Sequence, residues 1–227
     1  YAISGMATNP SFVKGSPDPL QFTSISLFMT NGFVMLGSNS FVKTLPEVVS
    51  AIRANPGKVS CASSGALPTV GCELLRAFAK ADMIMVNYKG NAPAVQAVMG
   101  DQVNLVFDPI TTALPFVKSG KLHAIAMMNP KRGGFGLPDL PTASEVFPDM
   151  WFEGWHGALG PGGMPRDVVA RMNREFDVVM KSADISKIFT GQGFNMVGGA
   201  PEVFTERLRI DLQKFSKVLT DAGVKPE

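Results

Sequence analysis

A repeated strand–loop–helix unit between residues 58 and 128 constrains the fold of this chain more than any other feature. Each unit has an apolar strand, a polar loop, a helix that begins at or near a proline, and a glycine stop. Strands that alternate with helices form a parallel sheet with right-handed crossovers. The sequence therefore predicts an α/β fold. The predicted strands are 58–62, 83–86, 103–107 and 122–127.

The polar loops of this repeat form the first candidate site. In a parallel sheet, the loops after the carboxyl ends of the strands gather at one edge, where ligands bind. The Ser63-Ser64-Gly65 loop leads directly into a helix with Pro68 in its first turn. Such a junction presents free backbone N–H groups and two hydroxyls, which suits an anion. It is also a common way to begin any crossover helix.

Two charged residues follow other strands of the repeat. Asp108 would repel an acidic ligand, so it either orients the loops, or accepts a ligand amine or hydroxyl, or caps the helix predicted at 109–118. These alternatives stay open at this point. Lys89 could offer a positive charge, but a solvated surface lysine is the preferred interpretation.

The remaining segments predict a second lobe built from both ends of the chain. Residues 25–36 read as a long or broken strand, and 152–159 as another. Turn residues dominate 9–19. Thr44 and Glu47 form a capping box. We predict one lobe from 1–31 plus 160–227, incomplete at its N-terminus, and another from 32–159, with hinge strands near 25–36 and 122–160.

Two late helices are predicted to bury one face each. The predicted inner faces are Val168, Val169, Met172, Phe176 and Val179 on the first helix, and Phe204, Leu208, Leu212, Phe215 and Leu219 on the second.

Composition excludes several classes of function. Lysine plus arginine is 21 and aspartate plus glutamate 19, without a basic stripe, so no nucleic-acid partner is expected. No run approaches about 18 apolar residues, so no membrane insertion is expected.

His123 and His156 lie in apolar segments without a Cys/His cluster, and we predict packed side chains and no metal site. Cys61 and Cys72 are either a disulfide or two buried thiols.

The order and spacing of many short segments resemble one family, the Bug-type (TctC-like) receptors of tripartite tricarboxylate transporters. No single segment is specific, but together they run through most of the chain. The matching segments include Asn9-Pro10-Ser11, Ala54-Asn55-Pro56-Gly57-Lys58, Ala62-Ser63-Ser64-Gly65, Tyr88-Lys89-Gly90, Phe107-Asp108, Ala113-Leu114-Pro115, Gly120-Lys121-Leu122, Lys131-Arg132, Leu137-Pro138-Asp139-Leu140-Pro141-Thr142, Pro161-Gly162-Gly163-Met164-Pro165 and Val197-Gly198-Gly199.

This resemblance implies a type II periplasmic-binding-protein fold, with two lobes of parallel-rich sheets joined by a hinge. It implies a periplasmic receptor that captures a small organic carboxylate in an interlobe cleft and delivers it to membrane permease subunits. It also implies a first strand, a Pro-Gly-Gly loop and a helix ahead of Tyr1, after a signal peptide. No cofactor and no catalytic residue are implied. The predicted ligand-binding residues are Ser4, Gly5, Ser63, Ser64, Gly65 and Asp108.

Two other functions remain open at this level. An α/β enzyme acting on a small acid is disfavoured, since no Ser-His-Asp order or GxGxxG loop occurs. An effector-binding regulatory domain can share this bilobal fold. A helix-turn-helix encoded ahead of Tyr1 would favour the regulator, whereas a signal peptide there would favour the receptor.

Overall fold

The structure, a computed structural model, describes residues 1–133 and 135–226 and divides into two compact units. Unit 1 is Tyr1–Asn31 with Gly154–Glu227, and unit 2 is Gly32–Glu153. The predicted second boundary was 159/160. The observed boundary is at 153/154, since β7 (Glu153–Gly160) pairs with β1 (Ala2–Ile3) and so belongs with the first residues of the chain.

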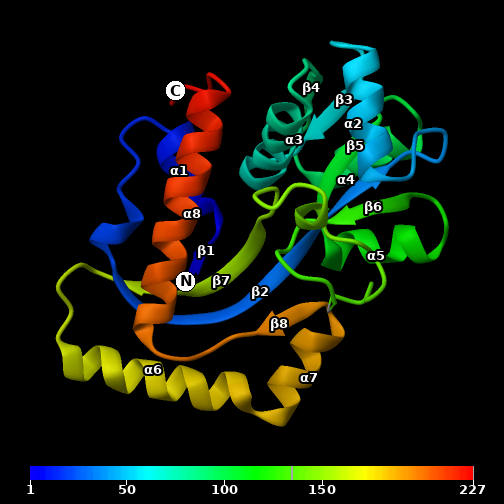
Figure 1. Cartoon of the computed structure of the whole chain (residues 1–227). Helices are drawn as coiled ribbons and strands as arrows, with labels where there is room; N and C mark the ends of the chain where they lie inside the picture. The colour runs from blue at the N-terminus through cyan, green and yellow to red at the C-terminus, as the bar shows by residue number, and fades with distance from the viewer. Residues whose placement is uncertain (134, 227) are drawn as a thin grey trace. The chain divides into compact units, whose positions relative to one another are not determined.

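Unit 2 contains a mixed sheet in which four strands share one direction (Figure 1). β3 (Ser60–Ser63) lies parallel between β4 (Ile84–Asn87) and β5 (Leu105–Pro109). The end of β2 (Thr23–Gly37) runs antiparallel between β5 and β6 (His123–Met127). The shared strand direction is confirmed. However, β6 pairs with β2 and not with another strand of the repeat.

Helices cover both faces of this sheet. Successive side chains of a strand point to opposite faces, so both faces carry apolar residues that must be buried. α4 (Asn91–Met99) and α5 (Ile110–Lys118) pack on the face that carries Val34, Leu36 and Val106. On the opposite face, Gly71 of α3 (Ala66–Ala79) lies so close to Phe107 that an added Cβ would come 2.6 Å from its ring. α2 (Leu45–Ala54) packs beside α3.

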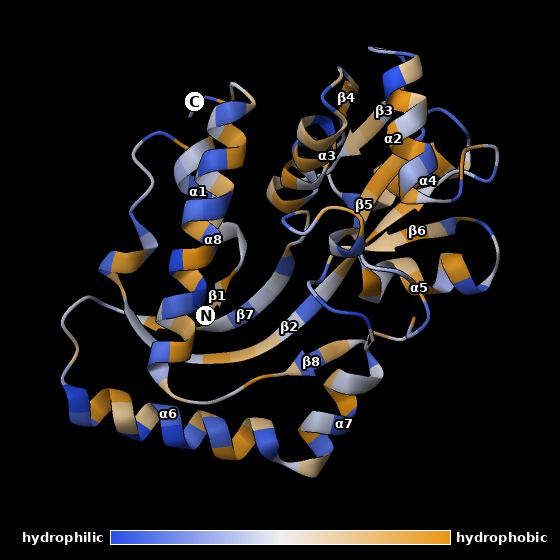
Figure 2. Ribbon diagram, viewed as in Figure 1, coloured by the Kyte–Doolittle hydropathy of each residue, from blue (hydrophilic) through white to orange (hydrophobic). Residues whose placement is uncertain are grey.

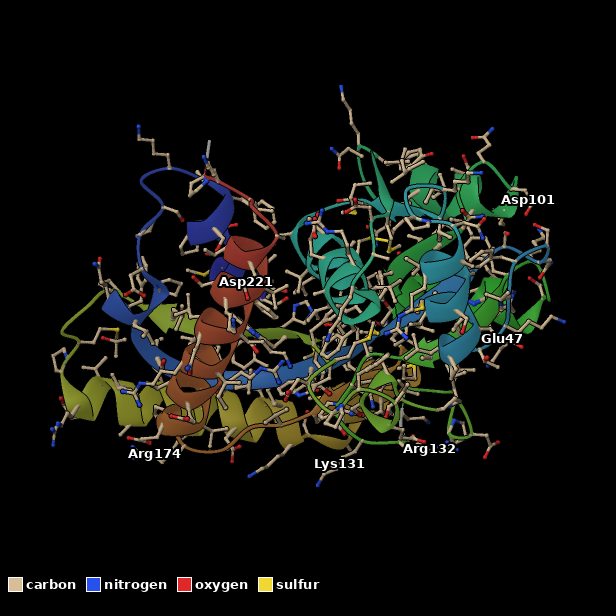
Figure 3. All side chains as sticks on the ribbon, turned by 45° about the horizontal axis from the view of Figure 1, so that its top comes forward. Glu47, Asp101, Lys131, Arg132, Arg174 and Asp221 are labelled. Atoms are coloured by element: carbon tan, nitrogen blue, oxygen red, sulfur yellow. A yellow bond between two sulfur atoms is a disulfide. The ribbon has the colours of Figure 1, made fainter. Side chains whose placement is uncertain are left out.

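Two features of unit 2 that the sequence raised, a capping box and a cysteine pair, can be checked in the structure. The predicted capping box is present: Glu47, labelled in Figure 3, accepts from the Thr44 N–H at 3.0 Å, and Thr44 Oγ1 accepts from the Glu47 N–H. Cys61 of β3 and Cys72 of α3 form a disulfide, with their Cα atoms 6.0 Å apart. This resolves the alternative that the sequence left open. The two cysteines meet because α3 packs on β3.

Unit 1 is built from strands contributed by both chain ends. β1 pairs antiparallel with β7, which neighbours the first half of β2, and β8 (Phe194–Met196) pairs with β2 at Met29–Asn31. Its helices are α1 (Gly5–Phe12), α6 (Arg166–Lys181), α7 (Ala183–Gly191) and α8 (Pro201–Asp221). Two short 3-10 turns lie at Pro19–Gln21 in unit 1 and Ala143–Glu145 in unit 2.

The inner face of α8 differs from its prediction at one position. Asp211, and not Leu212, is fully buried, while Leu212 is half-buried. Asp211 Oδ2 accepts hydrogen bonds from Trp155 Nε1 at 2.8 Å and from Arg207 Nε at 2.9 Å. The Trp155 ring also meets Phe204 edge-on, with centroids 5.0 Å apart. The Trp155–Asp211 hydrogen bond therefore ties α8 to β7, and the Arg207–Asp211 ion pair lies within α8. The residues of this face that are buried as predicted are Phe204, Leu208, Phe215 and Leu219.

Two further predictions for unit 1 were wrong. The segment around Pro10, predicted as turns, is the helix α1, which packs against α8. The packing of α1 against α8 stabilises the helix by more than the hydrogen bond lost at Pro10, which has no N–H, costs it. On α6, only Val169 is buried, whereas Val168 and Val179 are 40% and 52% exposed. Figure 2 accordingly shows hydrophobic residues distributed along α6 among hydrophilic ones.

Candidate ligand-binding site

Three helices of unit 2 begin at the carboxyl edge of adjacent strands. Gly65 precedes α3 with φ 149° and ψ −178°, and Gly90 precedes α4 with φ 102°. These positive φ values explain why glycine occupies both positions. Asp108 and Pro109 end β5 immediately before α5. First-turn N–H groups have no acceptor within their own helix, so the edge collects unpaired backbone donors and partial positive charge.

A chain of polar side chains joins the three loops. Ser64 Oγ donates to Asn91 Oδ1 at 2.8 Å, and Asn91 Nδ2 donates to Asp108 Oδ1 at 2.6 Å. Thr112 Oγ1 lies 2.5 Å from Asp108 Oδ2. The predicted residues Ser64 and Asp108 are thus connected through Asn91. Asn91 was not among the predicted site residues, although its place directly after the Gly90 turn was an available signal.

The first half of the Ser-Ser-Gly loop is also hydrogen-bonded internally. Ser63 is buried, and its hydroxyl contacts the hydroxyl of Thr69. Thr69 Oγ1 in turn donates to the Gly65 carbonyl at 2.8 Å. Gly65 itself is exposed. The backbone at Gly65 is therefore accessible, while the Ser63 side chain is committed to the loop.

Of the roles left open for Asp108, helix capping is wrong. The cap residue of α5 is Pro109, and no side chain forms a capping hydrogen bond there. Asp108 is fully buried and instead bonds side chains from two other positions, Asn91 and Thr112. This arrangement supports a role in orienting the loops.

Burial raises the pKa of Asp108 to about 6, although hydrogen bonds from Thr112 and Asn91 act in the opposite direction. The folded state therefore holds the proton more tightly than the unfolded chain, whose ordinary pKa is 3.8. The stability that this preference contributes is complete below pH 3.8 and is lost as pH rises through about 6. At neutral pH, the buried carboxylate thus destabilises the fold, by on the order of 3 kcal/mol for a pKa difference near 2.

Asp108→Asn, which cannot ionise, is consequently expected to unfold at higher urea concentration than the parent at pH 7.5. We expect a gain of about 1–3 kcal/mol at pH 7.5 that shrinks as the pH falls through about 6 and is lost by about pH 3, below both pKa values. Asp101→Asn is the matched control. The pKa of the exposed Asp101 is lowered by hydrogen bonds from Ser40 and Ser38, so its replacement should give no gain at pH 7.5. Equal urea midpoints for Asp108→Asn and the parent at both pH values would contradict this account of Asp108.

Ser4 and Gly5 belong to unit 1. The Ser4 N–H donates to the Trp155 carbonyl at 3.1 Å, and Ser4 precedes α1 without a side-chain capping bond. Ser4 is buried and Gly5 half-buried. Their role in ligand binding stays a prediction.

Lys89 was predicted as a surface lysine, and the two histidines were predicted as packed side chains. Lys89 is exposed. His123 Nε2 bonds the Val42 carbonyl at 2.8 Å, and His156 contacts the Tyr1 hydroxyl. Within residues 1–133 and 135–226, no three His, Cys, Asp or Glu side chains are grouped to hold a metal ion. In the same ranges, no helix combines the length and the apolar character needed to cross a membrane.

Sequence comparison identifies the family. The model of the family described as "Tripartite tricarboxylate transporter family receptor" (TctC) matches residues 5–223. The chain belongs to this receptor family. Among curated relatives, a UPF0065 protein from the tcbD-tcbE intergenic region of a Pseudomonas species is 28% identical over 192 residues. That match covers 83% of this chain and 57% of the relative, so the chain spans little more than half of that protein's length.

Solved structures share the fold of this chain. One described as a periplasmic transporter is 30% identical, with a TM-score of 0.83 over 99% of this chain and 77% of its own. MatC from Rhodopseudomonas palustris, solved with bound malate, is 25% identical, with a TM-score of 0.80 over 96% of this chain and 77% of its own. The periplasmic-binding-protein fold class and the family expected from the sequence are confirmed.

Proposed function

We propose that this chain is the solute-binding part of an extracytoplasmic receptor that captures a small organic carboxylate and passes it to membrane permease subunits. The match of residues 5–223 to the receptor family carries the proposal. The malate bound to the 25% identical MatC supports a carboxylate as the ligand class. Ser64 and Gly65 are the residues of unit 2 that we propose for ligand contact, and we propose that Ser63 supports the loop through its contact with Thr69.

The physical chemistry of the unit 2 edge fits a carboxylate. A carboxylate is strongly hydrated, so a site must replace its water with convergent donors. Hydrogen bonds to a charged group contribute about 1.5–3 kcal/mol each, and each helix N-terminus about 0.3–1. A few such contacts, less the entropy of association, give affinities near micromolar. Lys89 is exposed, so backbone donors are proposed as the main partners.

The Cys61–Cys72 disulfide supports a periplasmic location. Disulfides persist in oxidising compartments such as the bacterial periplasm and are rare in the reducing cytosol. We therefore propose periplasmic export of the protein.

A carboxylate ligand is expected to raise the melting temperature of the protein by about 5–10 °C. Ligand at 100 times its dissociation constant stabilises the folded state by about 2.7 kcal/mol, and each kcal/mol shifts the midpoint by roughly 2–4 °C at this chain length. The measurement is a thermal-shift screen of mono-, di- and tricarboxylates at pH 7.5, with the corresponding amides as uncharged controls. If no acid shifts the midpoint, or if the amides shift it equally, carboxylate binding is wrong.

The same screen separates the receptor from an enzyme. A receptor returns every acid unchanged after prolonged incubation, which nuclear magnetic resonance of the ligand would show. Turnover of a stabilising acid would instead favour the α/β enzyme.

A further inference from the structure

The directions of the hydrogen bonds at the unit 2 edge restrict the class of acid that fits, an inference that rests on the proposed function. A serine or threonine hydroxyl has one hydrogen to donate and two lone pairs that accept. Ser64 uses its hydrogen on Asn91 Oδ1 at 2.8 Å. Toward a ligand, the Ser64 oxygen therefore offers lone pairs only.

The orientation of the Asn91 amide follows from Asp108. A carboxylate only accepts hydrogen bonds, so the amide must turn its N–H group toward Asp108, at 2.6 Å. Its carbonyl oxygen then faces Ser64 and draws the serine hydrogen inward. Asp108 is fully buried, so it acts on Ser64 through Asn91 and not through solvent.

The hydrogen of the Ser63 hydroxyl is also used within the protein, but on Thr69 instead of Asn91. Thr69 donates its single hydrogen to the Gly65 carbonyl at 2.8 Å, since a carbonyl cannot donate. The contact between the Ser63 and Thr69 hydroxyls must then use the hydrogen of Ser63. Neither serine of the loop keeps a hydrogen for an anion. The donors left at this loop are backbone N–H groups in the first turn of α3, such as those of Ala66 and Leu67.

We propose that the site selects acids that carry a hydroxyl or ammonium donor close to the carboxylate. Backbone N–H groups of α3 bind the carboxylate, and the Ser64 oxygen accepts the neighbouring donor. Asp108 is a positioning residue that fixes this polarity through Asn91. An acid of the same shape without the donor leaves the Ser64 lone pairs without a ligand partner.

The test compares pairs of acids that differ by one hydroxyl: malate with succinate, and citrate with propane-1,2,3-tricarboxylate. Isothermal titration of the parent protein at pH 7.5 is expected to show the hydroxy acid of a binding pair bound about tenfold more tightly. Ser64→Ala is expected to reduce this ratio to below about threefold. Ser50→Ala is the control, since Ser50 also donates to a backbone carbonyl, that of Pro46, but lies on α2. It should keep the parent ratio.

The Asp108→Asn variant distinguishes a positioning role of Asp108 from a purely structural one, because the affinity ratio and the stability are expected to change in opposite directions. Its amide can donate to Asn91 Oδ1, which releases the Ser64 hydrogen, so the ratio should fall while urea stability at pH 7.5 rises. Equal affinities for both members of every binding pair in the parent, or an unchanged ratio in Ser64→Ala, overturn this inference and leave carboxylate capture intact. If none of the four acids nor the wider carboxylate panel binds, the proposed function itself fails and the inference with it.

Discussion

Asp211→Ala is expected to melt about 10 °C below the parent protein. Asp211 is fully buried, and the substitution removes the acceptor of both Trp155 Nε1 and Arg207 Nε, whose side chain is 14% exposed. Removing one partner of a buried ion pair costs about 3–5 kcal/mol, because the carboxylate that faces both Arg207 and Trp155 is lost. At about 2–4 °C per kcal/mol, the midpoint moves by roughly 10 °C.

The matched control for Asp211 lies on the same helix. Asp221, labelled on α8 in Figure 3, pairs with Lys217 four residues away at 2.6 Å, but its side chain is 60% exposed. Asp221→Ala should change the midpoint by no more than about 4 °C, since an exposed pair contributes under about 1 kcal/mol. Thermal scans followed by tryptophan fluorescence measure both variants. Similar midpoints for the two variants would contradict the assigned role of the buried pair.

Gly65→Ala is expected to weaken binding of the stabilising carboxylate by about 100-fold. A Cβ at Gly65 would meet nothing within 4 Å, so crowding is not the cause. The cause is the backbone, whose φ of 149° is open to glycine and strained for alanine, at about 1–3 kcal/mol. The loop must rotate to relieve that strain, and the rotation turns the N–H groups of the first turn of α3 away from the ligand. Loss of two charge-assisted hydrogen bonds, at about 1.5 kcal/mol each, corresponds to about 100-fold.

Gly57→Ala provides the control for Gly65. Gly57 also has positive φ, 72°, and an added Cβ there would meet nothing within 4 Å. It precedes β3, at the opposite end of the strand from the Ser-Ser-Gly loop. Both variants should lose a similar amount of stability in urea, but Gly57→Ala should bind like the parent in isothermal titration. If the two variants lose affinity equally, the loss reflects general destabilisation and not the geometry of the loop.

The elements predicted correctly from the sequence are those with local signals. The Thr44–Glu47 capping box and the strand–loop–helix units need only neighbouring residues, and they are present. The helix α1 was missed because its formation around Pro10 depends on packing with α8, far along the chain. The exposed Val168 and Val179 of α6 were misassigned because helical periodicity shows which residues share a face but not whether that face is covered.

The sequence predicts that the loops of the candidate site share one sheet edge, but it does not predict the hydrogen-bond directions of their side chains. Strand order alone brings Ser64 and Asp108 to one edge of unit 2, which general rules for α/β sheets anticipate. Which way the Ser64 hydroxyl points depends on Asn91, and the Asn91 amide depends on a carboxylate that follows another strand. Those dependencies arise only from side-chain geometry in the folded unit.

Amide chemical shifts test the central claim most directly. The protein, labelled with nitrogen-15, would be titrated with malate or with the acid that raises its melting temperature most. The account predicts that the largest shifts occur at the backbone N–H groups of residues 64–67, where α3 begins, with smaller changes at 90–92. A bound acid that leaves these amides unchanged and shifts others instead would show that the carboxylate is held elsewhere.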